Sequence, residues 1–168
     1  FCTMCHTNAT GVDVRSHLIG TTVFNCLYSP RATDEYHMAG EPYEKLAIWQ
    51  KAADLVEVVF ALNRAFEAEI KGSVGAQMTR AIVGMPTKIA EACVSESLDE
   101  SVKQLNAALA SIRETVSYVC LAERLGGTTR WQTRQLRKRA AALTRIIDHE
   151  IALLHDAMQE NDGTSLAA

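Results

Sequence analysis

Apolar residues recur at steps of three and four from residue 43 almost to the end of the chain, in four successive segments. This spacing places apolar side chains on one face of an α-helix, so each segment is predicted to be helical. The first predicted helix, 43–70, carries two neighbouring apolar rows: Trp49, Ala52, Val56 and Val59, and Ile48, Leu55, Leu62 and Phe66. An apolar face this wide must be covered from more than one side. Part of this face is therefore expected to be buried between subunits of an oligomer.

Short breaks separate the predicted helices. Lys71, Gly72 and Ser73 form the first break, where glycine can take the left-handed conformation that closes a helix. The second helix contains Pro86, which predicts a kink or a broken turn at that point. The inward-facing residues of this helix are Val74, Met78, Ala81, Ile82, Met85, Ile89 and Ala92.

The third and fourth helices are bounded by recognisable signals. Ser97 stands three residues before Glu100, which is the spacing of a capping box, and Gly126-Gly127 ends the third helix. The inward row of the third helix is Val102, Leu105, Leu109, Ile112, Val116 and Val119. The fourth helix is predicted over 128–159, with Leu136, Ala140, Leu143, Ile147, Ile151, Leu154 and Met158 inward. Four long helices with short loops predict an all-α, up-and-down four-helix bundle over 38–160, followed by a disordered tail, 161–168.

Residues 1–37 show neither a sustained helical stripe nor a clean alternating run. Because Met38 precedes the first helix as an initiator would, we interpret 1–37 as a leader, disordered or cloning-derived, outside the folded domain.

The leader begins with Cys2-x-x-Cys5-His6, the spacing that attaches a c-type haem. Cys2 and Cys5, together with Cys26 and a histidine, also have the ligand count of a zinc site. Haem attachment requires export, for which no signal is visible, and the zinc ligands lack a recognised spacing. An inert leader is therefore expected, with haem and zinc as the open alternatives.

Motifs along the first three predicted helices resemble the four-helix-bundle family named after proteins encoded in intervening sequences of bacterial 23S ribosomal RNA genes. The matching positions are Leu46, Trp49 and Ala52, then Gln77, Arg80 and Ala81, then Pro86, Ile89, Ala90 and Glu91, and finally Ser111, Glu114 and Thr115. The sequence departs from the family pattern at Gly84, Lys88 and Ala92. The resemblance covers about 43–125 and implies a ring-like homo-oligomer, with a pentamer favoured. Relatives are similar to the accessory protein of diversity-generating retroelements, which associates with a reverse transcriptase and RNA, and this implies a nucleic-acid role without catalysis.

Basic residues gather on one side of the fourth predicted helix. Arg130, Arg134, Arg137, Lys138 and Arg145 fall within an arc of about 100° on a helical wheel, with Arg139 nearer the flank. Such a face can neutralise phosphates without reading bases, and Trp131 beside it can stack on an unpaired base. The alternative is a solvated face, or one that pairs with Asp54, Glu57 and Glu67 of the same or a neighbouring subunit.

The second helix carries a polar row opposite its apolar row, made of Gln77, Arg80, Gly84, Lys88 and Glu91. This row is expected either to line a pore or partner groove, or to supply hydrogen bonds that set the register of an oligomer.

Several functional classes are not expected. No nucleophile, base and orienting residue are grouped at a recognised spacing, and no glycine-rich phosphate loop is present, so the protein is not expected to be an enzyme. His149 and His155 flank Glu150 but lie six residues apart, whereas the zinc motif on a helix needs four, so neither a metal nor a cofactor is expected. Cys93 and Cys120 are expected to be reduced, buried side chains.

The expected function is that of a non-enzymatic, oligomeric scaffold or adaptor for RNA or an RNA-handling protein. A formal net charge of −3 means that any nucleic-acid binding must come from a local patch. No apolar run reaches the roughly 18 residues of a membrane span, so a cytoplasmic protein without a membrane partner is expected. The open alternatives are a purely structural or protein-interaction oligomer, and a bundle that binds a small ligand or haem.

Overall fold

The computed structural model describes residues 42–165, and within them every regular element is helical. The elements are η1 (Pro42–Lys45), α3 (Ala47–Arg64), α4 (Ala68–Ile70), the π-helical η2 (Lys71–Gly75), α5 (Ala76–Val94), α6 (Leu98–Arg124) and α7 (Arg130–Ser165). The predicted all-α class is therefore confirmed. The leader, with Cys2, Cys5, His6 and Cys26, lies outside the described residues.

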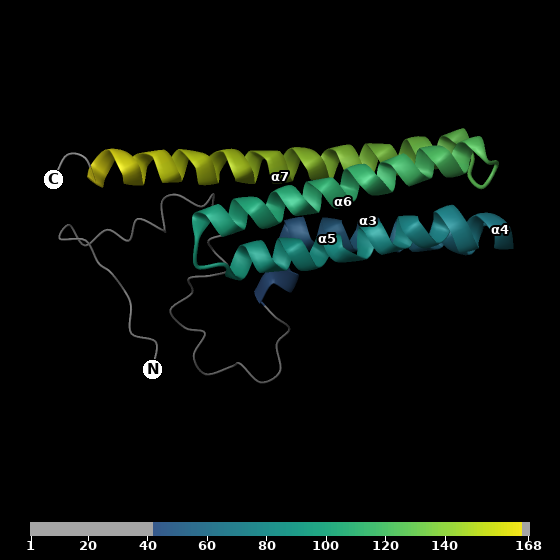
Figure 1. The fold of residues 1–168 in the computed structure, drawn as a ribbon, viewed down its shortest axis with the longest axis horizontal. Helices are drawn as coiled ribbons and strands as arrows, with labels where there is room; N and C mark the ends of the chain where they lie inside the picture. The colour runs from purple at the N-terminus through teal and green to yellow at the C-terminus, as the bar shows by residue number, and fades with distance from the viewer. Residues whose placement is uncertain (1–41, 166–168) are drawn as a thin grey trace.

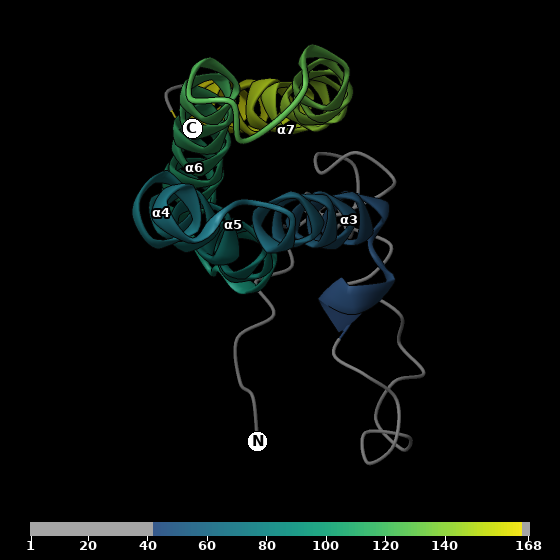
Figure 2. The ribbon, with the colours of Figure 1, turned by 90° about the vertical axis from the view of Figure 1, so that its right-hand side faces the viewer.

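The long helices form a four-helix bundle (Figure 1). α3 packs against α5 and α7, and α6 packs against the same two helices from the other side. The turn after α3 and the α6–α7 turn lie at one end of the bundle, which faces the viewer in Figure 2. Consecutive helices therefore run in opposite directions, as predicted for an up-and-down bundle.

The core consists largely of the predicted apolar rows. Ile82, Met85 and Ile89 of α5 are buried in this core. Leu136, Leu143 and Ile147 of α7 are buried in the same core. Burying one such side chain stabilises the fold by about 1.5–3 kcal/mol. In α6, Leu105, Leu109, Ile112 and Val119 are buried, whereas Val102 and Val116 are only partly buried at the edge of the core.

The first predicted break is wrong in position. α3 ends at Arg64, and the turn precedes α4, which continues through η2 into α5. Gly72 does not take a left-handed conformation, because the only glycine with a positive φ among the described residues is Gly126. Side-chain packing determines where the turn after α3 lies. Phe66 is buried beside Gly75, so close that a Cβ atom added to Gly75 would lie 3.1 Å from the Phe66 ring. The helix therefore turns where Phe66 can enter the core, and Lys71–Gly75 stays helical.

Two further local predictions need correction: the broken-turn alternative at Pro86 and the capping box at Ser97. α5 is helical from Ala76 to Val94, so Pro86 does not break the turn, although it leaves the Ile82 carbonyl without its usual helical donor. Ser97 is the residue before α6 but makes no side-chain cap hydrogen bond.

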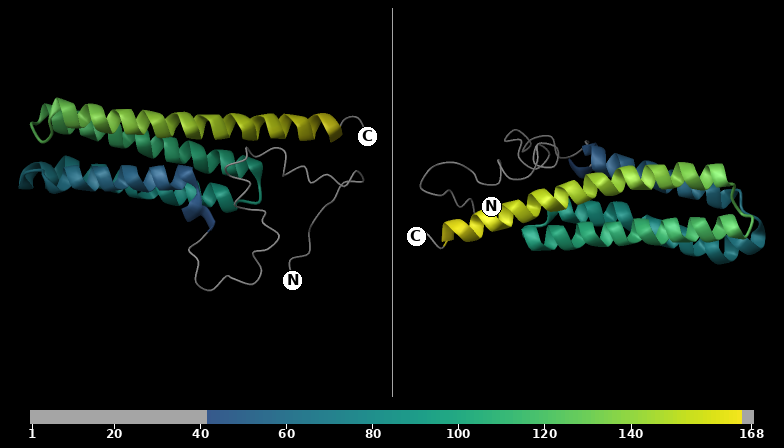
Figure 3. Two further views of the ribbon diagram at one scale, coloured as in Figure 1. Left: turned by 180° about the vertical axis from the view of Figure 1, so that it is seen from behind. Right: turned by 90° about the horizontal axis from the view of Figure 1, so that it is seen from above.

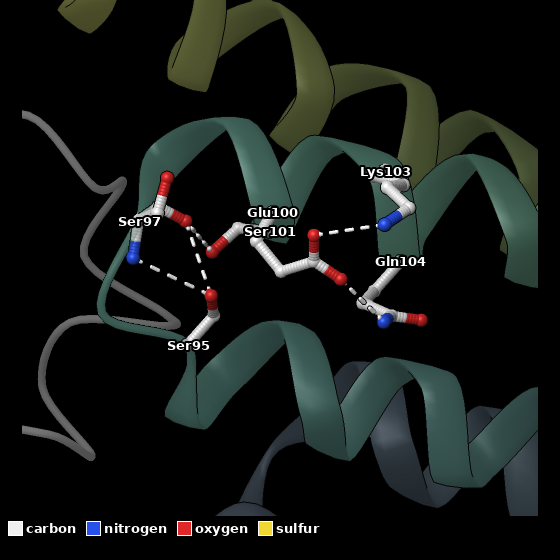
Figure 4. Close-up of polar contacts among 6 residues, drawn as sticks. All are labelled: Ser95, Ser97, Glu100, Ser101, Lys103 and Gln104. Carbon is white, nitrogen blue, oxygen red and sulfur yellow. Dashed lines mark hydrogen bonds and ion pairs between the residues drawn. The ribbon is translucent and has the colours of Figure 1, made fainter.

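The α5–α6 connection uses a different set of bonds (Figure 4). The Ser97 N–H donates to the Ser95 hydroxyl at 3.4 Å, and the Ser101 hydroxyl donates to the Ala92 carbonyl at 3.0 Å. Glu100 accepts from Lys103 and Gln104 instead of closing the capping box. Lys103 and Gln104 lie three and four residues after Glu100, so they are its neighbours on the helix surface. A capping box would instead require the Glu100 side chain to reach back to the Ser97 N–H.

The α6–α7 turn agrees with the predicted stop at Gly126-Gly127. Gly126 has φ 80°, its N–H donates to the Glu123 carbonyl at 3.1 Å, and the Gly127 N–H donates to the Ala122 carbonyl at 2.8 Å. This pair of bonds is a Schellman motif. α7 then starts with a reciprocal cap that the sequence reading missed: the Gln132 N–H donates to the Thr129 hydroxyl at 3.2 Å, and the Thr129 N–H donates to the Gln132 side chain at 2.9 Å.

α7 is longer than predicted. It continues to Ser165, past the expected end at 159, and its C-terminal part extends beyond the start of α6 (Figure 3).

Candidate nucleic-acid interface

The predicted basic residues of α7 do lie on an exposed side of the bundle. The Thr129–Gln132 cap fixes where α7 begins, and the buried row through Leu136 fixes its rotation. The exposed residues on the opposite flank are Arg130, Arg134, Arg137, Lys138 and Arg145, which we call the α7 basic surface. Trp131 lies next to it with 68% of its surface exposed.

Most of this surface has no counter-charge within the described chain. Arg130 forms one ion pair, at 3.7 Å between its Nε and a carboxylate oxygen of Glu123, and the Arg130 side chain is 94% exposed. The other four cations form no ion pair with a described residue. The predicted alternative of pairing with Asp54, Glu57 and Glu67 therefore does not occur within one described subunit.

Part of the α7 basic surface is hollowed into a groove. The groove has a volume of about 560 Å³ and is lined by Glu123, Arg130, Thr133, Arg134, Arg137, Lys138 and Ala141. Its four cations span about 12 Å along α7, given a rise of about 1.5 Å per residue. Arginine guanidinium groups bind phosphate through paired N–H donors, so this arrangement suits a chain of phosphates.

Sequence reasoning missed two polar groove residues, Thr133 and Glu123. Thr133 is only 3% exposed, and its hydroxyl has no hydrogen-bond partner in the described structure. The Glu123 side chain comes from α6 and is 29% exposed. Thr133 could have been found from its position along α7, three residues after Arg130 and four before Arg137. The approach of Glu123, in contrast, depends on how the α6–α7 turn folds.

The predicted polar row of α5 lies on the surface of the single chain. Gln77, Arg80 and Glu91 are exposed and Lys88 is half-buried. None of these side chains is hydrogen-bonded or ion-paired to a described residue. The role of this polar row in a pore or an interface stays a prediction.

The remaining sequence candidates are dispersed. Within 43–159, no group of three or more His, Cys, Asp and Glu side chains lies close enough to hold a metal ion. Glu150 is buried, and burial raises the pKa of its carboxyl group, while nearby His149 acts in the opposite direction. Cys93 is buried as predicted, but Cys120 is only partly buried. None of the described helices is long and apolar enough to cross a membrane.

Comparison with known proteins agrees with this fold. A crystal structure of a protein of unknown function from the S23 ribosomal protein family of Bacteroides thetaiotaomicron VPI-5482 superposes with a TM-score of 0.58 at 19% identity, over 62% of this chain and 97% of that chain. No curated protein matches the chain. The family model of the 23S rRNA-intervening sequence protein matches residues 44–149, which is more than half of the chain. The chain therefore belongs to the 23S rRNA-intervening sequence protein family.

Proposed function

We propose that this protein is a non-enzymatic helical scaffold that binds the phosphate backbone of RNA through the α7 basic surface. The observation that carries the proposal is the groove on α7, in which Arg134, Arg137 and Lys138 have no ion-pair partner among the described residues. Cations held without counter-charges can release counterions from a nucleic acid, and this release drives phosphate binding. An exposed tryptophan next to them supplies a stacking platform for an unpaired base.

The proposal predicts a steep salt dependence that is nearly independent of sequence. Replacing Arg134, Arg137 and Lys138 together by glutamine should lower the slope of log affinity against log salt by roughly two units, because each lost contact removes somewhat less than one counterion. The measurement is fluorescence anisotropy of a labelled single-stranded RNA across a salt series.

A matched control removes three exposed cations from elsewhere: Lys45, Lys51 and Arg113, all changed to glutamine. This control should leave the slope nearly unchanged. Absence of binding by the unmodified protein at low salt would contradict the proposal, and so would an equal effect of the two triple variants.

We also propose that the protein acts as a homo-oligomer, with five copies implied by the family resemblance. Within one chain, Ile48, Val59 and Phe66 are buried, so the wide apolar face of α3 is mostly covered internally. Phe60 stays 37% exposed, and Val83 and Val94 of α5 are exposed as well, which leaves apolar surface for contacts between subunits.

Light scattering at micromolar concentration should give a multiple of the 18.4 kDa chain mass, and a monomer mass would reject the oligomer. If the α7 triple variant dissociates into subunits, the basic surface is a subunit contact. A protein-interaction oligomer without nucleic acid would then be the better description. A visible absorption band in the purified protein would instead favour the haem alternative.

A further inference from the structure

The groove on α7 contains one negative charge among its cations. Glu123 reaches it from α6, and its carboxylate lies 3.7 Å from the Arg130 Nε, which is longer than a hydrogen bond. No described residue donates a hydrogen bond to this carboxylate. Because the Arg130 side chain is 94% exposed, water screens the ion pair and makes it weak. Glu123 therefore offers open acceptor positions to whatever enters the groove.

A carboxylate placed here repels bare phosphate groups, since it accepts hydrogen bonds and cannot donate them. It favours a ligand that carries a neutral donor directly beside a phosphate. Thr133 lines the same groove, but its unpartnered hydroxyl is buried, so the Glu123 carboxylate is the exposed acceptor of the groove. The lining thus suits a ligand with alternating anionic and donor groups better than a ligand with phosphates alone.

In a nucleic-acid strand, two kinds of donor can meet this requirement. The ribose 2′-hydroxyl adjoins the backbone at every nucleotide of RNA and is absent from DNA. Base amino groups project away from the backbone and vary with sequence. If Arg134 and Arg137 hold consecutive phosphates, the sugars that join those phosphates stay in the groove that Glu123 also lines. Trp131, which does not line the groove, is left for a base.

We propose that Glu123 selects ribose over deoxyribose by accepting a hydrogen bond from a 2′-hydroxyl of a strand bound on the α7 basic surface. This inference rests on the proposed function, because it assumes that the same surface holds the phosphates. Glu123 acts here as a specificity residue, and the cations supply most of the affinity.

The test compares the affinities of labelled oligo(rU) and oligo(dU) of equal length for the full chain at low salt. The unmodified protein should prefer oligo(rU) by about tenfold, which is the lower end expected for a hydrogen bond to a charged group. Glu123→Ala should raise the affinity for oligo(dU), since a repulsive charge is lost, and should bring the ratio of the two affinities close to one. Glu123→Gln keeps an acceptor oxygen and should retain part of the preference.

Glu114→Ala is the matched control, because Glu114 is an exposed α6 carboxylate that does not line the groove. It should leave the preference for oligo(rU) unchanged. Equal affinity of the unmodified protein for the two strands would overturn the selection by Glu123 and leave the proposed function standing. Binding of neither strand would overturn both. If oligo(dA) binds as tightly as oligo(rU) and loses that affinity in Glu123→Ala, the donor is a base amine and the assignment to ribose is wrong.

Discussion

Replacing Gly126 by alanine tests whether the α6–α7 turn depends on backbone conformation alone. Gly126 has φ 80°, and a Cβ atom added there would have no neighbour within 4 Å, so the cost contains no steric clash with the rest of the protein. A left-handed conformation costs an alanine about 1–2 kcal/mol. Alanine also restricts the unfolded chain, which returns about 0.4–1 kcal/mol. The net loss in free energy of unfolding should be about 1 kcal/mol.

Gly84→Ala is the matched variant. Gly84 lies inside α5, does not have a positive φ, and also has no atom within 4 Å of an added Cβ. In a helix interior, alanine is favoured over glycine by about 1 kcal/mol, so this variant should gain stability. The two substitutions are chemically identical and should differ by about 2 kcal/mol with opposite signs.

The measurement is urea unfolding followed by far-ultraviolet circular dichroism, at one fixed protein concentration because assembly would contribute to stability. A stabilised Gly126→Ala variant would refute the argument, because it would mean that the turn accepts a conformation other than the left-handed one. A destabilised Gly84→Ala variant would refute the other half, because it would reveal a close neighbour at that position.

Two further predictions concern buried side chains. Because burial raises the pKa of Glu150, the folded protein binds that proton more tightly than the unfolded chain, so its stability should fall as the pH rises above 4.5 through the folded-state pKa. Glu150→Met should flatten this dependence and add about 1–2 kcal/mol at neutral pH in unfolding experiments, and a loss of stability there would indicate an unseen partner for the carboxylate. Ile82 is completely buried, so Ile82→Ala should cost about 2–5 kcal/mol of unfolding free energy. Thr87→Ala, at an exposed position of the same helix, should stay within about 0.5 kcal/mol, and similar losses for both would contradict the assigned core face.

The number, order and inward faces of the helices could be predicted from the sequence, because apolar spacing reports burial directly. The rows through Ile82 and Leu136 are buried as expected. The exposed flank with Arg134 and Arg137 follows from the same periodicity, since residues opposite a buried row must face solvent. The end of α6 at Gly126 could also be predicted from local sequence, because few residues other than glycine adopt the left-handed conformation found there.

Tertiary structure decided what local signals left open. The turn after α3 lies where Phe66 can be buried beside Gly75, and this contact outweighs the glycine signal in Lys71–Gly75. The Glu100 carboxylate accepts hydrogen bonds from Lys103 and Gln104, one turn further along α6, so the expected capping box does not form. The approach of Glu123 to Arg130 arises from the folded α6–α7 turn, because the spacing of two residues along the chain does not specify the rotation of two helices about a turn. Periodicity determines which face of a helix is buried, whereas contacts across elements determine where helices end and which polar groups meet.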